Sequence, residues 1–251
     1  MALSQEGSIV TQQKELVSIL EKYGVDIIWA EDVPGSKYQI FTRDPFIVID
    51  DKFILSHMKE RERQSEPEGA KLLLDTVDPV KKICSPQDAI VEGGDIIPHG
   101  DKLLIGQDGL RTNKNGFEFI KKHFENKFDI IPIYMQENMK DRSLMHLDCA
   151  FSPVWYDTML VAPDGIRDKS LYTLQEIFPN IITVSKRQCD ELGVNVISLG
   201  DKTVIVQKRH KKIINNLESK GFNVEVINSY ASADLEGFSR CMTCPLEREL
   251  L

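Results

Sequence analysis

Hydrophobic and polar positions along the chain predict a repeated unit made of a β-hairpin, a helix and a strand. Each predicted hairpin has two short apolar runs around a polar turn, and Asp-Lys recurs in three of these turns, at 51–52, 101–102 and 201–202. A stretch with apolar residues at helical spacing follows each hairpin, and another short apolar run follows each helix. The predicted hairpins span 46–55, 95–106, 154–161 and 194–206; the helices span 67–76, 113–126, 169–177 and 208–220; the strands span 80–84, 128–134, 181–185 and 222–228.

A fifth unit is predicted from the two ends of the chain. A helix at 11–23, ended by Gly24, and a strand at 25–29 fit the same order if the C-terminal region supplies the closing hairpin. A period of roughly 50 residues is typical of repeat or propeller-like architecture. We therefore predict a single α/β domain over residues 1–251, closed with pseudo-fivefold symmetry, whose axis gathers loops from every unit at one mouth.

Composition and charge exclude several classes of function. The chain has 251 residues, of which 41% are hydrophobic and 28% charged, so it can form a sizeable core. A net charge of −8 argues against nucleic acid or an anionic membrane as the main partner. No apolar run approaches bilayer length, the N-terminus lacks a signal-peptide pattern, and five irregularly spaced cysteines fit a reducing compartment. We expect a cytoplasmic protein without a membrane or nucleic-acid partner; a homo-oligomer is left open.

Four segments stand at equivalent places beside the predicted hairpins: 41–45 (Phe-Thr-Arg-Asp-Pro), 91–95 (Val-Glu-Gly-Gly-Asp), 145–148 (Met-His-Leu-Asp) and 236–246 around Cys241. Each has a purely structural interpretation when taken alone. These are a turn, a bulge, a strand end with His146 and Asp148 on one face, and a buried thiol. Because all four adjoin hairpins in the same way, we expect them to meet at the mouth.

The residue types in these segments indicate chemistry on a planar cation. Cysteine is a strong nucleophile as thiolate, and an imidazole can move the protons. A peptide carbonyl gains nothing from a carboxylate cluster, whereas the N–H pairs of a guanidinium match carboxylates bidentately. A divalent metal is the alternative explanation for clustered carboxylates. The spacing of Cys241 and Cys244 also fits half a zinc site or a redox pair, but the other cysteines and histidines lie at no ligand spacing.

As a set, the four segments resemble the guanidino-group modifying superfamily, which comprises arginine deiminases, dimethylarginine dimethylaminohydrolases and amidinotransferases. The resemblance extends from Phe41 to Leu246, and the motifs are most similar to the arginine deiminase branch. Residues 58–66 are also similar to an Arg-rich turn of deiminases and amidinotransferases. The resemblance implies the pentein fold, a five-bladed α/β propeller, with a small arginine-like guanidino substrate and neither a cofactor nor a metal.

The resemblance also implies roles for individual residues. Cys241 is the expected nucleophile and His146 the acid and base. The expected guanidinium ligands are three carboxylates, of which Glu92 also belongs to the catalytic set: Asp44, Glu92 and Asp148.

Two arginines, Arg63 and Arg111, fall near the places where deiminases bind the substrate carboxylate. A solvated surface charge explains both of them equally well.

The activity implied is cysteine-dependent hydrolysis of arginine or a derivative, through a covalent amidino intermediate, with release of ammonia or an amine. Deiminases commonly have Asn shortly before Thr-Arg-Asp-Pro, where this chain has Tyr38 or Gln39, and the chain is shorter than usual deiminases. The substrate's tail, one or two rounds of hydrolysis, dimethylarginine hydrolysis and amidino transfer to an amine therefore stay open. A non-enzymatic binding protein of the same fold is disfavoured, because Cys241 and His146 are both present.

Overall fold

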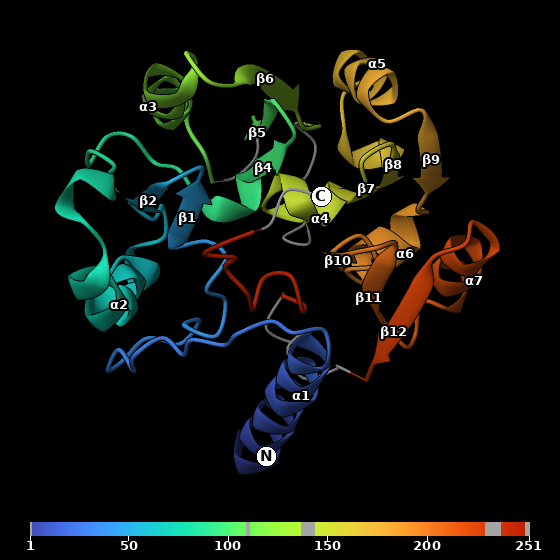
Figure 1. Ribbon diagram of the computed structural model, residues 1–251, viewed down its shortest axis with the longest axis horizontal. Coiled ribbons are helices and arrows are strands. Elements are labelled where there is room, and N and C mark those ends of the chain that lie inside the picture. The colour runs from blue at the N-terminus through green and yellow to red at the C-terminus, as the bar shows by residue number, and fades with distance from the viewer. Residues whose placement is uncertain (1, 109–110, 137–143, 229–236, 249–251) are drawn as a thin grey trace.

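Four three-stranded sheets stand around a common centre in the computed structural model, which describes residues 2–108, 111–136, 144–228 and 237–248 (Figure 1). In each sheet the middle strand pairs antiparallel with the strand before it and parallel with the strand after it. The strands are β1 Phe46–Ile49, β2 Lys52–Leu55, β3 Lys82–Cys84, β4 Ile96–His99, β5 Lys102–Gln107, β6 Asp129–Tyr134, β7 Phe151–Trp155, β8 Thr158–Val161, β9 Asn180–Thr183, β10 Ile197–Gly200, β11 Thr203–Gln207 and β12 Asn223–Ile227. The four predicted hairpins and the four predicted strands that follow them are confirmed.

One helix joins the middle and last strands of every sheet and lies on the outer rim (Figure 1). Parallel strands need such a crossover connection. These helices are α2 Lys71–Thr76, α3 Lys114–Phe124, α5 Asp168–Ile177 and α7 Lys211–Ser219. Each has an apolar stripe that covers its sheet; in α7, for example, Ile213 and Leu217 are buried.

Two of the three Asp-Lys pairs occupy the same place in their hairpin turns, whereas Asp201 and Lys202 are themselves the two turn residues of the third, with φ of +43° and +54°. Lys52 and Lys102 begin the returning strands, paired with Ile49 and His99. The residue two positions earlier, Asp50 or Gly100, has a φ of +55° or +56°. Two-residue hairpin turns need this left-handed conformation, which glycine and aspartate adopt most readily.

The predicted fifth unit is wrong in its strands. Helix α1 runs over Ala2–Lys22, earlier than predicted, and ends at Gly24, whose φ is +73°. The predicted strand at 25–29 is not formed, and the described residues 237–248 contain no strand that could pair with it. Ile28 and Trp29 are therefore 61% and 63% exposed instead of packed in a sheet.

Helix α1 covers the fourth sheet in place of a fifth one. Its Leu16 and Leu20 pack with Ile205 and Ile227 of β11 and β12. Two helices that the hydrophobic pattern did not predict, α4 Leu147–Ala150 and α6 Lys186–Asp190, lie toward the centre. Within the described part of the chain, no helix is long and apolar enough to cross a bilayer.

Candidate active site

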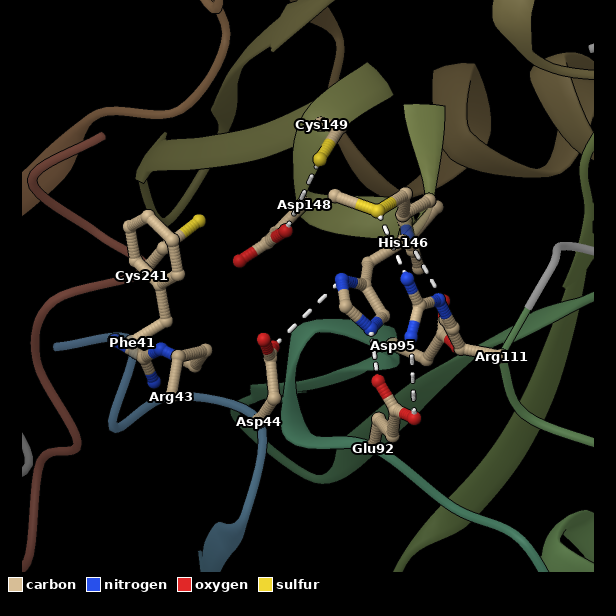
Figure 2. A network of polar contacts seen from close by, with 12 residues as sticks. Phe41, Arg43, Asp44, Glu92, Asp95, Arg111, His146, Asp148, Cys149 and Cys241 are labelled. Carbon is tan, nitrogen blue, oxygen red and sulfur yellow. Dashed lines mark hydrogen bonds and ion pairs between the residues drawn. The ribbon is translucent and has the colours of Figure 1, made fainter. Parts of the chain in front are cut away.

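The four segments predicted to meet do meet at the centre of the ring, just before the first strands of three sheets and in the C-terminal segment (Figure 2). Backbone hydrogen bonds join them directly. Arg43 N donates to the carbonyl oxygen of Cys241 at 3.0 Å, and Gly93 N donates to that of Asp44 at 3.0 Å. These bonds fix the backbones that carry the candidate side chains relative to one another.

Gly93 and Gly94 are required by close packing. A Cβ on Gly93 would lie 2.0 Å from the carbonyl oxygen of Arg43, and one on Gly94 would lie 2.6 Å from Cγ of His146. The glycine pair therefore lets the backbone pass directly against the imidazole.

His146 is buried between two carboxylates. Its Nε2 lies 2.8 Å from Oε2 of Glu92, and its Nδ1 lies 3.6 Å from Oδ1 of Asp44. Burial alone would lower the pKa of His146, but the charge of Asp44 and the hydrogen bond to Glu92 outweigh it and raise the pKa to about 10. The imidazole is therefore a protonated acid at neutral pH.

The strand geometry predicted for His146 and Asp148 is wrong, because helix α4 begins between them. Asp95 causes the turn: its carboxylate accepts hydrogen bonds from Leu147 N at 2.8 Å and from Thr112 N at 3.2 Å. A carboxylate at the first peptide N–H groups favours the start of a helical turn. Burial raises the pKa of Asp95 to about 6. Asp95 was part of the recognised motif, but its bracing role was not predicted.

Asp44 is bound on its other side by Arg63. Nη1 of Arg63 lies 2.9 Å from Oδ2 of Asp44, while its Nε and Nη2 donate to Glu66 at 3.0 and 2.8 Å. Arg63 is thus 6% exposed, which excludes the solvated surface charge. Burial alone would raise the pKa of Asp44, but the charges of His146 and Arg63 outweigh it and hold the pKa below its usual range. Asp44 and Glu66 thus occupy the guanidinium of Arg63 in this arrangement.

Arg111 lies beside Glu92 and has guanidinium N–H groups that are not used in hydrogen bonds within the described residues (Figure 2). Its Nη1 lies 3.9 Å from Glu92 and 3.6 Å from Glu60, and its Nη2 lies 3.1 Å from the sulfur of Met145. Its Nε and Nη1 are buried without a hydrogen-bond partner among the described residues. Arg111 is therefore better placed than Arg63 to bind an anionic group.

Cys241 lies on the opposite side of Asp148 from Cys149 (Figure 2). Burial raises the pKa of the Cys241 thiol, and the charges of Asp148 and Asp44 raise it further. Asp148 is itself paired with Arg240, whose Nε lies 3.3 Å from its Oδ2. The resting nucleophile candidate is therefore a neutral thiol next to two carboxylates.

Sequence reasoning missed Asn195, a buried side chain that contacts Cys241. The available signal was a single amide between two valines, Val194 and Val196, in an otherwise apolar run.

Two groups of these side chains also have the composition of a metal site. Asp44, Glu92 and His146 form one, and His146, Asp148 and Cys149 form the other; within each, the ligand atoms lie within 4.8 Å of one another. A metal ion would have to displace the proton of His146, since only a neutral imidazole ligates. In this arrangement the imidazole of His146 and the guanidinium groups of Arg63 and Arg240 already contact the three carboxylates.

Comparison with known proteins agrees with this geometry. The family model described as arginine deiminase matches residues 31–182. The Bacillus subtilis protein YkgA is 27% identical over 94% of this chain and 79% of its own length. Arginine deiminase of Streptococcus agalactiae is 26% identical over 83% of this chain, which spans 60% of that enzyme.

Solved structures confirm the predicted pentein fold. The N-terminal domain of ArgZ, an arginine dihydrolase from cyanobacteria, superposes with a TM-score of 0.86 at 21% identity, over 96% of this chain and 87% of that one. The amidinotransferase SxtG of Microseira wollei gives a TM-score of 0.84 at 20% identity over 99% and 85% of the two chains. A dimethylarginine dimethylaminohydrolase gives 0.79 at 20% over 92% and 88%. The chain belongs to the arginine deiminase family, within the superfamily of enzymes that modify guanidino groups.

Proposed function

We propose that this chain is a hydrolase that acts on the guanidinium group of arginine or a close derivative, through a covalent intermediate on Cys241. The observation that carries the proposal is the buried imidazole of His146, 2.8 Å from Glu92 and 3.6 Å from Asp44, in a site that also contains a thiol. Hydrolysis of a guanidinium needs a cation site, a nucleophile and an acid for the leaving amine. The match to the arginine deiminase family model supports the same reaction.

The carboxylates would bind the substrate. Oδ1 of Asp44 is buried and accepts no hydrogen bond from the described residues, so it can accept one from a guanidinium N–H. The carboxylate of Asp148 lies nearby (Figure 2), whereas both oxygens of Glu92 already have hydrogen-bond partners, Lys59 N and His146 Nε2. A bound cation also favours the charged form of a nearby thiol. We therefore expect Cys241 to lose its proton to solvent when the substrate binds; an unchanged thiol pKa with a bound guanidinium analogue would contradict this.

The first half of the reaction forms the covalent intermediate. The thiolate of Cys241 attacks the central guanidinium carbon and forms an S–C bond. His146 donates its proton to the departing nitrogen, the C–N bond breaks, and ammonia leaves. A cationic amidino-thioether remains on Cys241, and His146 is neutral.

The second half releases the product. Neutral His146 accepts a proton from water as the oxygen attacks the same carbon. The S–C bond then breaks, Cys241 leaves as thiolate, and the remaining hydroxyl proton is lost to solvent to give the ureido product. The proton that His146 accepted from the attacking water restores the imidazolium. The structure of an ArgZ domain covalently bound to a reaction intermediate supports a covalent route in this fold.

The test is incubation of the purified protein with free arginine, with ammonia, citrulline and ornithine followed by mass spectrometry. We expect ammonia with citrulline, or with ornithine if hydrolysis occurs twice, and we expect Cys241→Ala to abolish both. Cys84→Ser is the matched control, because Cys84 is an exposed cysteine on β3. Its turnover should equal that of the wild type.

Other outcomes separate the alternatives. An adduct on Cys241 that turns over only when an amine is added would identify an amidinotransferase. Turnover of methylated arginine alone would identify a dimethylarginine hydrolase. Neither an adduct nor a product with any of these compounds would refute guanidino chemistry on Cys241.

A further inference from the structure

The side chain of Asn195 reaches the sulfur of Cys241 from the segment between α6 and β10. It is fully buried, and 46 residues separate it from Cys241 in the sequence. Its neighbours Val194 and Val196 belong to the largest apolar cluster, which fixes the backbone on both sides.

All the side-chain hydrogen bonds that the structure gives Asn195 lead to the candidate site. Its Nδ2 donates to Sγ of Cys241 at 3.2 Å and approaches the carbonyl oxygen of Asp148 at 3.5 Å, while Oδ1 accepts from Cys241 N at 3.4 Å. The peptide N–H of Cys241 can only donate, so the amide oxygen must face it. That requirement directs the amide nitrogen toward the sulfur.

Two of these three hydrogen bonds join main-chain groups, and the third reaches the sulfur of Cys241. Burying a polar side chain costs free energy unless it is hydrogen-bonded, and an apolar residue would fill the space between two core valines. The groups that use the amide here are the backbone and the sulfur of Cys241 and the carbonyl of Asp148. The feature that requires asparagine is therefore the cysteine.

We propose that Asn195 is a catalytic residue, whose amide holds Cys241 in place and donates a hydrogen bond that stabilises the thiolate. The inference rests on the proposed role of Cys241 as nucleophile. A hydrogen bond to a charged acceptor is stronger than one to a neutral acceptor, so the amide favours the thiolate over the thiol. It opposes the effects of burial and of the neighbouring carboxylates, which disfavour the thiolate. The same bond assists Cys241 when it attacks and when it leaves.

The experiment measures alkylation by iodoacetamide at each cysteine, resolved by mass spectrometry, as a function of pH. The wild type is compared with Asn195→Ala, which removes the amide, and with Asn195→Asp, which has the same shape but places a negative charge beside the sulfur. We expect Cys241 to react more slowly in both variants at neutral pH, by roughly tenfold for each unit by which the thiol pKa rises. The decrease should be larger for Asn195→Asp.

Three of the other cysteines are internal controls in the same sample. Cys84 is exposed and should be labelled equally in every protein. Cys149 and Cys189 are 2% and 1% exposed, against 6% for Cys241, and should stay unlabelled while the fold is intact. Asn195→Ser, which keeps a smaller donor, should fall between the wild type and Asn195→Ala. Labelling of Cys149 and Cys189 would show that a variant has lost its fold, and Asn195→Ser is then compared with the wild type in place of that variant.

An unchanged Cys241 rate and pH profile in folded variants would overturn the proposal. Alkylation requires no substrate, so this result is independent of the proposed function. Failure of the wild type to turn over arginine would refute the proposed activity without altering the labelling comparison.

Discussion

Replacing Glu92 by glutamine tests whether His146 is held as an imidazolium. The amide of glutamine has nearly the same shape as the carboxylate, so the variant removes one negative charge 2.8 Å from Nε2 of His146, while its amide oxygen can still accept the hydrogen bond from Lys59 N. Asp44 remains at 3.6 Å and continues to favour the proton. We expect the pKa of His146 to fall from about 10 toward its ordinary value of 6.5.

The consequence for stability follows from proton linkage. Because the folded pKa is raised, His146 contributes stability that is fully present below the unfolded pKa of 6.5 and is lost as the pH rises through about 10. Between these values the folded chain binds one proton more than the unfolded chain. The free energy of unfolding therefore falls by about 1.4 kcal/mol per pH unit through this group alone. From about pH 7 to about pH 9, the wild type should lose roughly 3 kcal/mol through His146.

Urea unfolding at about pH 7 and about pH 9 measures this loss directly and needs no catalytic activity. We expect the loss in Glu92→Gln to be smaller by about 1 kcal/mol or more, since His146 gives up its proton at lower pH in the folded variant while its unfolded pKa is unchanged. Ionisation of cysteines in the unfolded chain adds to the loss at alkaline pH, but equally in both proteins. Glu118→Gln, on the exposed face of α3, is the matched control and should behave as the wild type. Identical pH dependence in Glu92→Gln and the wild type would refute the assignment of the proton to His146.

Three further outcomes are expected from the same site. Gly94→Ala would place a Cβ 2.6 Å from His146 Cγ and should reduce arginine turnover by at least about tenfold with the circular-dichroism spectrum unchanged; normal turnover would show that the imidazole can shift without consequence. Arg63→Ala leaves Asp44 and Glu66 buried without their shared cation, so the free energy of unfolding measured in urea should fall by about 3–5 kcal/mol. A fall of less than about 1 kcal/mol would mean that water hydrates the two carboxylates. Removal of metal ions with a chelator should leave turnover unchanged, because the proposed route uses only the imidazolium and the thiol; lost activity restored by one metal would favour a metal on the carboxylates.

The hairpins and their following strands were predictable because their signals are local. An apolar run, a two-residue turn and a second apolar run determine the pairing of Ile49 with Lys52 without information from elsewhere in the chain. Helix boundaries were less predictable. The helix expected over 67–76 divides into a 3₁₀ turn at Glu66–Ala70 and the short α2, because Pro67 and Gly69 disfavour a continuous α-helix.

The strand expected at 25–29 shows what a local pattern omits. Val25, Ile27 and Ile28 have a strand-like composition, but a strand also needs a neighbour with free N–H and C=O groups. No described strand pairs with this segment, and α1 covers the fourth sheet. The composition of a segment does not reveal whether a sheet has a free edge strand with which the segment can pair.

In the candidate site too, features that depend on local sequence were predictable, and features that depend on the packing of distant segments were not. Three of the four motifs could be placed together because each stands just before a hairpin, and repetition carries that position into space; the segment around Cys241 adjoins no strand in the described residues 237–248. Asn195 has no motif around it, and its contact with Cys241 depends on how two distant segments pack. The helical turn at Asp148 depends on Asp95, which is 52 residues away from its partner Leu147.

The arginines give the physical link between the sequence pattern and the proposed substrate. Arg63 binds Asp44 at 2.9 Å, and Arg240 approaches Asp148 at 3.3 Å, so one oxygen of each carboxylate is paired with a guanidinium of the protein itself, while Oδ1 of Asp44 has no hydrogen-bond partner among the described residues. Neither carboxylate is stabilised by solvent, since both are almost fully buried. A carboxylate in such a place persists as an anion only beside a cation with matching N–H groups. We expect a guanidino substrate to be bound by the same kind of pairing, through the free Oδ1 of Asp44, next to the proposed nucleophile Cys241.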